Sequence, residues 1–313
     1  MNKKVVVLGG GTGQSSLLRG LKLFPLDITA VVTVADDGKS TGKLRKEFNI
    51  PGVGDIRRVL ISLSETEEVV EKLVDYRFKT DSDLDGHSIG NIILTALIDL
   101  YGDLTTAVKE ISKMLNLKGK VYPLTNDNVV LMGKMNNGKT IEGEHNITES
   151  QLNIKKVFYK KEPQINKEVL REIEDSDLII LSMGSLYTSI IPNLISKQII
   201  KAIDSSKAKI MYVCNIMTQP GETDDFKVSD HINVLNSYLG KRKVDAVIVN
   251  NEKIDEALIE NYRNKEQKDL VIYDKENIKC KVIAKPLLKV DENGSLRHDS
   301  VRVGLEILNY LIK

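Results

Sequence analysis

The 313-residue chain contains no tryptophan, only two cysteines, and aromatic side chains at 5% of its positions. Proteins that bind single-stranded nucleic acid stack the bases on aromatic side chains, so this composition argues against that class. No charge of one sign dominates either, because 45 Lys and Arg against 44 Asp and Glu give a formal net charge of +1. A general nucleic-acid binder is strongly basic, and we therefore expect no nucleic-acid partner.

The chain also lacks the cysteine pattern of a secreted protein and the apolar run of a membrane protein. Cys214 and Cys280 have no CxxC spacing and are too few for a disulfide framework, which is typical of a reduced compartment. The apolar run Val5–Leu8 is too short for a signal peptide, and no run approaches the length of a membrane span. These absences predict a cytoplasmic protein with no membrane span.

The most informative stretch that is present is a glycine cluster near the N-terminus. The β-branched run Val5–Leu8 leads into Gly9-Gly10-Gly11-Thr12-Gly13 and then into an amphipathic segment over Ser15–Leu21, an order that predicts strand, tight turn and helix. Glycines let the backbone approach a bound group, and the amides at a helix start favour an anion such as phosphate. The sequence therefore predicts phosphate contacts from Gly10, Gly11, Thr12 and Gly13.

This cluster matches neither common nucleotide-binding motif completely. The dinucleotide fingerprint has glycine at its first, third and sixth positions; Gly9 and Gly11 fit, but Gln14 occupies the sixth. A P-loop is excluded because no Lys-Ser or Lys-Thr pair follows the glycines. The alternative is a turn that only lets the helix fold back on its strand. We favour a nucleotide-like ligand, since strand and helix are both in place.

Acidic and hydroxyl side chains follow the second predicted strand, Ile28–Val34, which closes a βαβ unit. Asp36 and Asp37 come at its carboxyl end, where doubly wound sheets bind ligands and where an acid binds a ribose hydroxyl or, with phosphate present, a cation. The two aspartates are therefore the candidates for a metal site, with turn chemistry as the alternative. Side chains suited to phosphate follow at Lys39, Ser40, Thr41 and Arg45.

Two further polar segments precede apolar helices. Asp55 follows Gly54 and is either a ligand contact or a helix N-cap, and Arg57 is either a ligand contact or a solvated surface residue. The loop before residue 92 brings His87 and Asn91 to a buried helix start, which is a natural place to contact an anion or a substrate.

The second half of the chain repeats this order of elements. It follows a β-rich insertion at about 120–160, with a hairpin at Asn136–Gly138, which we interpret as a dimer or lid element. A buried strand at 177–182 then ends in a second glycine-led helix start. We expect one α/β domain, 1–313, of two Rossmann-like halves around a doubly wound, mainly parallel sheet. The second helix start supplies candidate contacts at Gly184, Ser185, Thr188 and Ser189.

Two residues near the C-terminal end are candidates to close the site. Tyr262, at the end of a predicted helix, suits stacking on a base or sugar, and Arg297, leading the final helix, suits pairing with phosphate. A packed tyrosine and a surface arginine are the alternatives. Asp299 or Ser300 is expected to cap the final helix.

Six segments, taken in order, resemble the CofD/YvcK family over nearly the whole chain. They are Gly9–Gly13, Ala35–Gly38, Gly54–Arg57, Gly86–Asn91, Gly184–Ser189 and Cys214–Thr223. The Met-Thr-Gln-Pro-Gly-Glu-Thr sequence of the last segment is similar to the branch of gluconeogenesis factors. Three positions depart from the family pattern: Lys39 stands where glycine is usual, and Val53 and Met183 where proline is common. The resemblance implies further ligand contacts at Asn215, Thr218, Gln219, Glu222 and Thr223.

The resemblance implies a regulatory protein that binds a nucleotide sugar such as UDP-N-acetylglucosamine. Its implied roles are in central carbon metabolism, cell shape and cell-wall synthesis, with proteins of those processes as partners. The family's other branch implies a magnesium-dependent transferase that moves a phospholactyl group from a nucleotide diphosphate onto a deazaflavin. The residues themselves do not define a catalytic site, because the sequence shows no nucleophile paired with a base and no complete set of metal ligands. Both classes stay open, with the regulator favoured, the catalytic residues unassigned, magnesium as the cofactor to test and a homo-oligomer expected.

Overall fold

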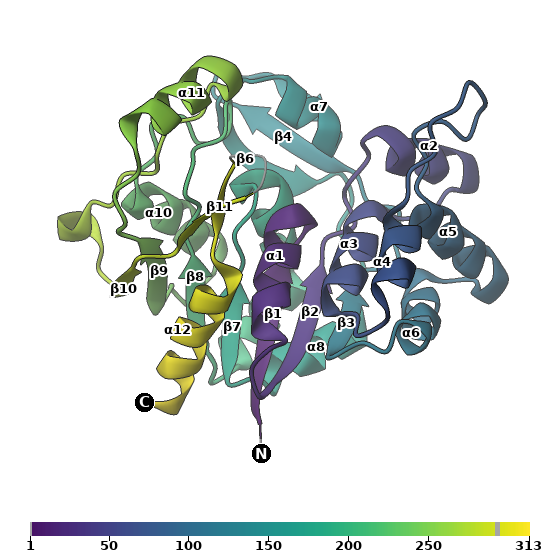
Figure 1. Ribbon diagram of the computed structural model, residues 1–313, viewed down its shortest axis with the longest axis horizontal. Coiled ribbons are helices and arrows are strands. Elements are labelled where there is room, and N and C mark those ends of the chain that lie inside the picture. Colours follow the sequence, from purple (N-terminus) through teal and green to yellow (C-terminus); the bar gives the residue numbers. More distant parts are fainter. Residues whose placement is uncertain (1, 292–294) are drawn as a thin grey trace.

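The computed structural model describes residues 2–291 and 295–313, and its centre is a seven-stranded parallel sheet (Figure 1). The strand order is β10-β9-β8-β7-β1-β2-β3. Strands such as β1 and β7 are continuous apolar runs because helices cover both faces of the sheet, and Val5–Leu8 are at most 1% exposed. The strands are β1 (Lys3–Gly9), β2 (Leu26–Val32), β3 (Lys120–Pro123), β7 (Leu178–Leu181), β8 (Lys209–Val213), β9 (Ala246–Asn250) and β10 (Lys281–Lys285).

The order of the strands reverses between β1 and β7. From β1 the chain adds β2 and β3 toward one edge, and from β7 it adds β8, β9 and β10 toward the other. Right-handed crossovers therefore place the helices of the two runs on opposite faces of the sheet. This confirms the predicted doubly wound fold and puts its switch point between the carboxyl ends of β1 and β7.

Helices pack on both faces of the sheet. On one face α1 (Gly11–Leu21) lies between α3 (Gly54–Leu63) and α12 (Ser300–Ile312), while α8 (Lys167–Glu174) packs against α9 (Lys197–Ser205) (Figure 1). In the parts that the structure describes, no helix is both long and apolar enough to cross a bilayer. The remaining α-helices are α2 (Lys39–Phe48), α4 (Glu68–Asp75), α5 (Ile89–Tyr101), α6 (Leu104–Met114), α7 (Glu144–Glu149), α10 (Val228–Tyr238) and α11 (Glu256–Glu266). The shorter turns are a π-helix η1 (Leu186–Ile190) and the 3₁₀-helices η2 (Ile191–Leu194) and η3 (Lys275–Asn277).

The inserted β-rich segment forms a separate antiparallel sheet in the order β5-β4-β6, with β4 (Leu131–Met135), β5 (Thr140–Glu142) and β6 (Ile154–Tyr159). The hairpin predicted at the Asn-Gly pair joins β4 to β5, and the amide of Gly138 donates to the carbonyl of Met135 at 3.1 Å. Residues 120–123 instead extend the main sheet as β3. The insertion also contains the short helix α7, in which the amide of His145 donates to Asp37 at 2.8 Å.

Near the C-terminal end, Leu270 to Tyr273 makes only isolated bridges, because its neighbours are loops and not a regular strand. Arg297 lies on β12 (Leu296–His298), which pairs with β11 (Leu288–Val290), and so precedes the final helix without belonging to it. Asp299 caps that helix, as predicted, by accepting from the amides of Val301 and Arg302.

Candidate functional site

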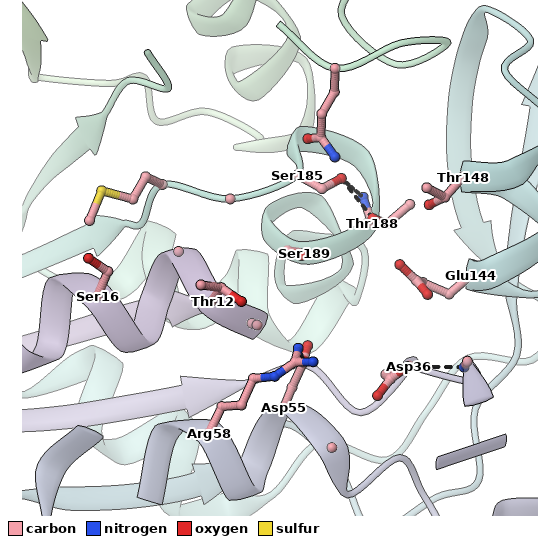
Figure 2. A pocket seen from close by; sticks show the side chains of 18 of the residues that line it. Thr12, Ser16, Asp36, Asp55, Arg58, Glu144, Thr148, Ser185, Thr188 and Ser189 are labelled. Carbon is pink, nitrogen blue, oxygen red and sulfur yellow. Dashed lines mark hydrogen bonds and ion pairs between the residues drawn. The ribbon is translucent and has the colours of Figure 1, made fainter. Parts of the chain in front are cut away.

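The carboxyl ends of the central strands open into a cleft of about 610 Å³. Figure 2 shows side chains entering it from α1, α3, α7 and η1. All but five of the contacts predicted from the sequence line this cleft, so the structure gathers residues from both halves of the chain. They are Gly10, Gly11, Thr12, Gly13, Asp36, Lys39, Ser40, Thr41, Asp55, Arg57, Asn91, Gly184, Ser185, Thr188, Ser189, Asn215, Thr218, Gln219, Tyr262 and Arg297.

The two glycine-led loops touch each other at the switch point. Gly11 begins α1 with a φ of +62°, in the left-handed region that glycine adopts without strain. A Cβ atom on Gly13 would lie only 2.0 Å from the carbonyl oxygen of Met183. Gly13 is therefore required for the first turn of α1 to pack directly on the loop that follows β7.

Gln14 explains the departure from the dinucleotide fingerprint. Its Nε2 donates to the carbonyl oxygens of Val7 and Val31, each at 2.9 Å, and the side chain is fully buried. It thereby joins β1 to β2 beneath the glycine loop. A glycine at this position would leave both carbonyl groups without this buried partner, at a cost in stability.

Asn215 fixes the second glycine loop. Its Oδ1 accepts from the amide of Gly184 at 3.0 Å, and its Nδ2 donates to the carbonyl of the same residue at 2.7 Å. Ser185 then caps η1, with its Oγ accepting from the amide of Thr188 at 3.1 Å. Glu222 lies behind this loop, outside the cleft lining, and accepts a hydrogen bond from the Ser185 hydroxyl.

His87 and Thr223 also lie outside the lining, and each contacts a residue that is in it. Asp37 and Arg45, the other two outside it, are described below. His87 is buried, with its Nδ1 3.0 Å from the Oγ of Ser40, and Asn91 donates to the same hydroxyl at 3.3 Å. Burial is the main cause that lowers the pKa of His87. Thr223 accepts from the amide of Gln219 at 2.9 Å. His87 and Thr223 therefore position neighbouring groups instead of facing the cleft.

The two aspartates after β2 do not converge on one point. Asp36 accepts from the amide of Gly38 at 3.0 Å, whereas Asp37 accepts from the amide of His145 at 2.8 Å and so holds α7. Across residues 2–291 and 295–313, no group of three or more His, Cys, Asp and Glu side chains is arranged to hold a metal ion. Asp36 lines the cleft and Asp37 supports α7, and a magnesium site at this pair stays a prediction.

Asp55 is not the N-cap of α3, because that helix begins at Gly54 and Asp55 lies in its first turn. It accepts from the backbone of Gly11 and pairs with Arg58 at 3.3 Å, so it links α3 to the glycine loop. Burial, reinforced by the charge of Asp36, raises the pKa of Asp55 to about 7. Its carboxyl group can therefore hold a proton near neutral pH.

Several cationic side chains surround these acids. Arg58, Arg77 and Lys268 line the cleft although the sequence did not mark them as contacts. Arg57 also lines it but pairs with Asp75 behind α3. Cations at the rim favour an anionic ligand.

Arg45 does not serve as the phosphate contact that its sequence position suggested. Its guanidinium donates to the carbonyls of Ala35 and Asp36, each at 2.9 Å, and to Asn128 at 2.7 Å. It is buried by these bonds and ties the loop after β2 to the segment leading into the insertion.

The far side of the cleft comes from the C-terminal third of the chain. Tyr262 is 6% exposed, and its hydroxyl accepts from the amide of Leu296 at 2.7 Å. Arg297, the next residue on β12, lines the cleft, and its Nε lies 3.5 Å from Oδ2 of Asp291. The side chain of Tyr262 thus holds β12 in place beside the cleft.

Sequence reasoning also missed the contribution of the insertion. Glu144, His145 and Thr148 of α7 line the cleft, and Figure 2 shows Glu144 and Thr148 facing η1. No local motif marks them, since they reach the site only through the packing of α7. Further lining residues that were not predicted as contacts are Ser16, Gly38, Gly54, Met183, Ile216, Met217, Glu266, Leu296 and His298.

Comparison with known proteins agrees with this fold. The family model described as 2-phospho-L-lactate transferase CofD matches residues 5–288. The chain is 42% identical over 309 residues to a protein of Halalkalibacterium halodurans named gluconeogenesis factor, covering 98% of this chain and 96% of that protein. It is 44% identical over 312 residues to the gluconeogenesis factor of Bacillus subtilis, covering 98% of each.

Solved structures agree as well. A crystal structure of a Bacillus halodurans protein superposes with a TM-score of 0.95 at 42% identity, covering 98% of this chain and 100% of that one. A second, described as a member of the UPF0052 family, gives a TM-score of 0.94 at 41% identity, covering 98% and 99%. These matches confirm the resemblance drawn from the six sequence segments. The chain belongs to the CofD family, and its curated relatives within that family are gluconeogenesis factors.

Proposed function

We propose that this chain binds a nucleotide sugar of the UDP-N-acetylglucosamine type and, through it, regulates central carbon metabolism, cell shape and cell-wall synthesis. One observation carries the proposal: the glycine-led start of α1 and the loop at Gly184 meet at the switch point and line one cleft. The first amides of a helix lack intrahelical partners and favour phosphate oxygens. A diphosphate is the ligand group that would fill both loops together.

The other lining groups suit the two ends of such a ligand. Asp36, at the end of the second strand, corresponds to the acid that binds ribose hydroxyls in doubly wound folds. Arg58, Arg77 and Arg297 add cations at the rim. The name gluconeogenesis factor, carried by the relatives, supports a role in carbon metabolism.

A thermal-shift series with UDP-N-acetylglucosamine, NAD, GDP and GTP tests the ligand class. A ligand at 100 times its dissociation constant stabilises the folded state by roughly 2.7 kcal/mol. We expect the largest shift with UDP-N-acetylglucosamine. A larger shift of the melting temperature with GDP or NAD would show that the ligand belongs to another class. No shift with any of the four compounds would overturn nucleotide binding.

A transferase of phosphate-linked groups is the second candidate, in line with the family's description as 2-phospho-L-lactate transferase CofD. The observation that favours it is Asp55, whose raised pKa of about 7 suits an acid or base in proton transfer. Mass spectrometry of nucleotide sugar, GDP-linked donor and deazaflavin acceptor, incubated with protein and magnesium, decides between the classes. Products that form with the wild type and are absent with Asp55→Asn would replace the regulatory proposal.

A further inference from the structure

Arg57 is a buried arginine whose hydrogen bonds are incomplete. Its side chain is 3% exposed and lines the cleft, and its Nη1 donates to Asp75. Within residues 2–291 and 295–313, its Nε is buried without a partner and its Nη2 makes no hydrogen bond. The edge formed by Nε and Nη2 is one that binds phosphate or carboxylate through two parallel bonds. Because unpaired buried charged donors are costly, this edge lacks an acceptor that the chain itself does not provide.

Asn91 lies beside Arg57 and also keeps an unused polar atom. A Cβ atom on Gly90 would lie 2.8 Å from Cδ of Arg57, so the arginine side chain runs along the first turn of α5. Asn91 is 2% exposed, lines the cleft and donates through Nδ2 to Oγ of Ser40 at 3.3 Å. Its Oδ1 is buried with no partner among the described residues. Two neighbouring buried side chains thus have unsatisfied groups at the same end of the cleft.

The side chain of Asn91 can present donors to an anion. A hydroxyl both donates and accepts, and Nδ1 of His87, 3.0 Å from Oγ of Ser40, can donate to that oxygen. The amide of Asn91 can then turn over, accept from Ser40 through Oδ1 and direct its N–H groups toward a ligand. In that arrangement every one of these buried groups has a partner once an anion is bound.

The start of α2 adds donors at the same place. α2 packs beside α5 (Figure 1), and its N-cap residue Gly38 provides no side-chain cap. The first amides of a helix have no intrahelical acceptor and favour an anion. Lys39, Ser40 and Thr41 of this first turn all line the cleft. Donors therefore come from α2, α3 and α5, and a phosphate monoester, with three free oxygens, can meet all three, whereas a carboxylate has two.

The charges at this end of the cleft favour the same kind of ligand. Burial is the largest cause that lowers the pKa of Arg57; Asp75 raises it, and the nearby charges of Arg58 and Arg77 lower it again. Arg77 also lines the cleft and has no carboxylate partner in the part of the chain that the structure describes. Positive charge is therefore in excess here, and a phosphate group would balance it.

This group of donors lies away from the glycine loop that begins α1. Asp55 and Arg57 are two residues apart in α3 and so point in directions about 200° apart around the helix. Asp55 accepts from the backbone of Gly11, whereas Arg57 runs against Gly90 of α5. A diphosphate at the glycine loops and an anion at Arg57 therefore occupy different positions on the two sides of α3.

We propose that Arg57, Asn91 and the start of α2 form a second anion site, which binds a small phosphate monoester beside the nucleotide. The inference rests on the proposed function in one respect: UDP-N-acetylglucosamine has no phosphate beyond its diphosphate, so the monoester belongs to a second molecule. With both sites occupied, the protein responds to a nucleotide sugar and to a phosphorylated small molecule together.

Nitrogen-15 NMR of the arginine Nε–H groups tests the site, with methyl phosphate as the probe. The Arg57 signal, identified by its absence from Arg57→Lys, should shift when methyl phosphate is titrated into the ligand-free protein. Acetate at the same ionic strength should leave it in place. No shift with methyl phosphate, or an equal shift with acetate, overturns the proposal, and neither result depends on nucleotide binding.

Arg77→Gln is a second variant, chosen because Arg77 is exposed and its replacement should leave the fold intact. Calorimetry should show affinity for methyl phosphate reduced by about tenfold or more, as expected for the loss of one charge-assisted hydrogen bond. Arg19→Gln is the matched control, because Arg19 is exposed and does not line the cleft. Equal affinities of the two variants for methyl phosphate would contradict the proposed site.

Titrating methyl phosphate into protein saturated with UDP-N-acetylglucosamine tests whether the two ligands bind together. The shift of the Arg57 signal should persist. Its loss would show that the nucleotide sugar occupies this position and would overturn the assignment to a second molecule. Failure of UDP-N-acetylglucosamine to bind at all overturns the proposed function, whereas the response of the ligand-free protein to methyl phosphate still decides whether the anion site exists.

Discussion

Asn215 holds both the amide and the carbonyl of Gly184, at 3.0 and 2.7 Å, and so joins the end of β8 to the loop that follows β7. The glycine itself has a φ of +148°, a conformation that L side chains rarely adopt. A side chain from one strand end thus fixes the backbone of the next strand end. The shape of the cleft depends on this pair as much as on the glycine cluster at the N-terminus.

Replacing Asn215 by alanine should destabilise the protein by roughly 1–2 kcal/mol, since two hydrogen bonds to a partly buried peptide group are lost. Nucleotide affinity should fall as well, because the Gly184 loop is no longer fixed. Urea denaturation and calorimetry measure the two effects. Asn215→Asp keeps only the acceptor and should lie between the wild type and Asn215→Ala; an Asn215→Ala protein with unchanged stability and affinity would contradict the assigned role.

Lys39→Gly should stabilise the fold. Lys39 begins α2 with a φ of +39°, in the left-handed region, which costs a non-glycine residue roughly 1–2 kcal/mol. We expect about 1 kcal/mol of added stability and weaker nucleotide binding, because a cation is removed from the cleft. A lower midpoint of urea denaturation would contradict the strain.

Stability should fall as pH rises, because the pKa of Asp55 is raised from its ordinary value of 3.8 to about 7. Between these values the folded state holds a proton that the unfolded state releases, so the loss accumulates from about pH 4 and is complete above pH 7. Its size is on the order of 4 kcal/mol. Asp55→Asn should reduce this dependence in urea denaturation at pH 5, 7 and 8.5, and Glu144, whose pKa is raised by burial to about 8, accounts for the part that remains.

Asp177→Asn is the control for that series. The amide of Lys4 is the main cause that lowers the pKa of Asp177, so its contribution to stability is present above pH 3.8 and disappears only as the pH falls further. The slope between pH 5 and 8.5 should therefore match the wild type. An unchanged slope in Asp55→Asn would show that Asp55 is ionised throughout this range.

Arg297→Ala should weaken nucleotide binding by roughly 1.5–3 kcal/mol if Arg297 makes a charge-assisted bond to phosphate, and leave folding nearly unchanged. Arg302 provides a matched control, since both arginines are 55% exposed and paired with an aspartate, but only Arg297 lines the cleft. Calorimetry on both variants separates the roles. Equal affinities in the two variants would show that Arg297 is a surface residue that does not contact the ligand.

The sequence predicted the fold because its signals are local. Buried strands such as Val5–Leu8 are continuous apolar runs, and glycines mark the turns that follow them. Most of the site followed from the same logic, since the carboxyl ends of parallel strands meet at one edge. The division into two Rossmann-like halves and the cytoplasmic location stay predictions.

The parts that sequence reasoning missed depend on which way a side chain turns. Asp36 and Asp37 are neighbours in sequence, but one faces the cleft and the other holds α7. Arg45 was expected to bind phosphate and instead binds backbone carbonyls. Glu144 reaches the cleft only through the tertiary placement of the insertion, which no pattern within residues 120–160 encodes.

Calorimetric titration of UDP-N-acetylglucosamine into the wild type, Ser16→Tyr and Arg19→Tyr tests the central claim most directly. Ser16 faces the cleft from α1 (Figure 2), so a tyrosine there would fill the ligand space. Arg19 is exposed on the same helix and does not line the cleft. We predict one binding site per chain in the wild type and in Arg19→Tyr, and none in Ser16→Tyr. Absence of binding in the wild type, or undiminished binding in Ser16→Tyr, would contradict a nucleotide-sugar site in this cleft.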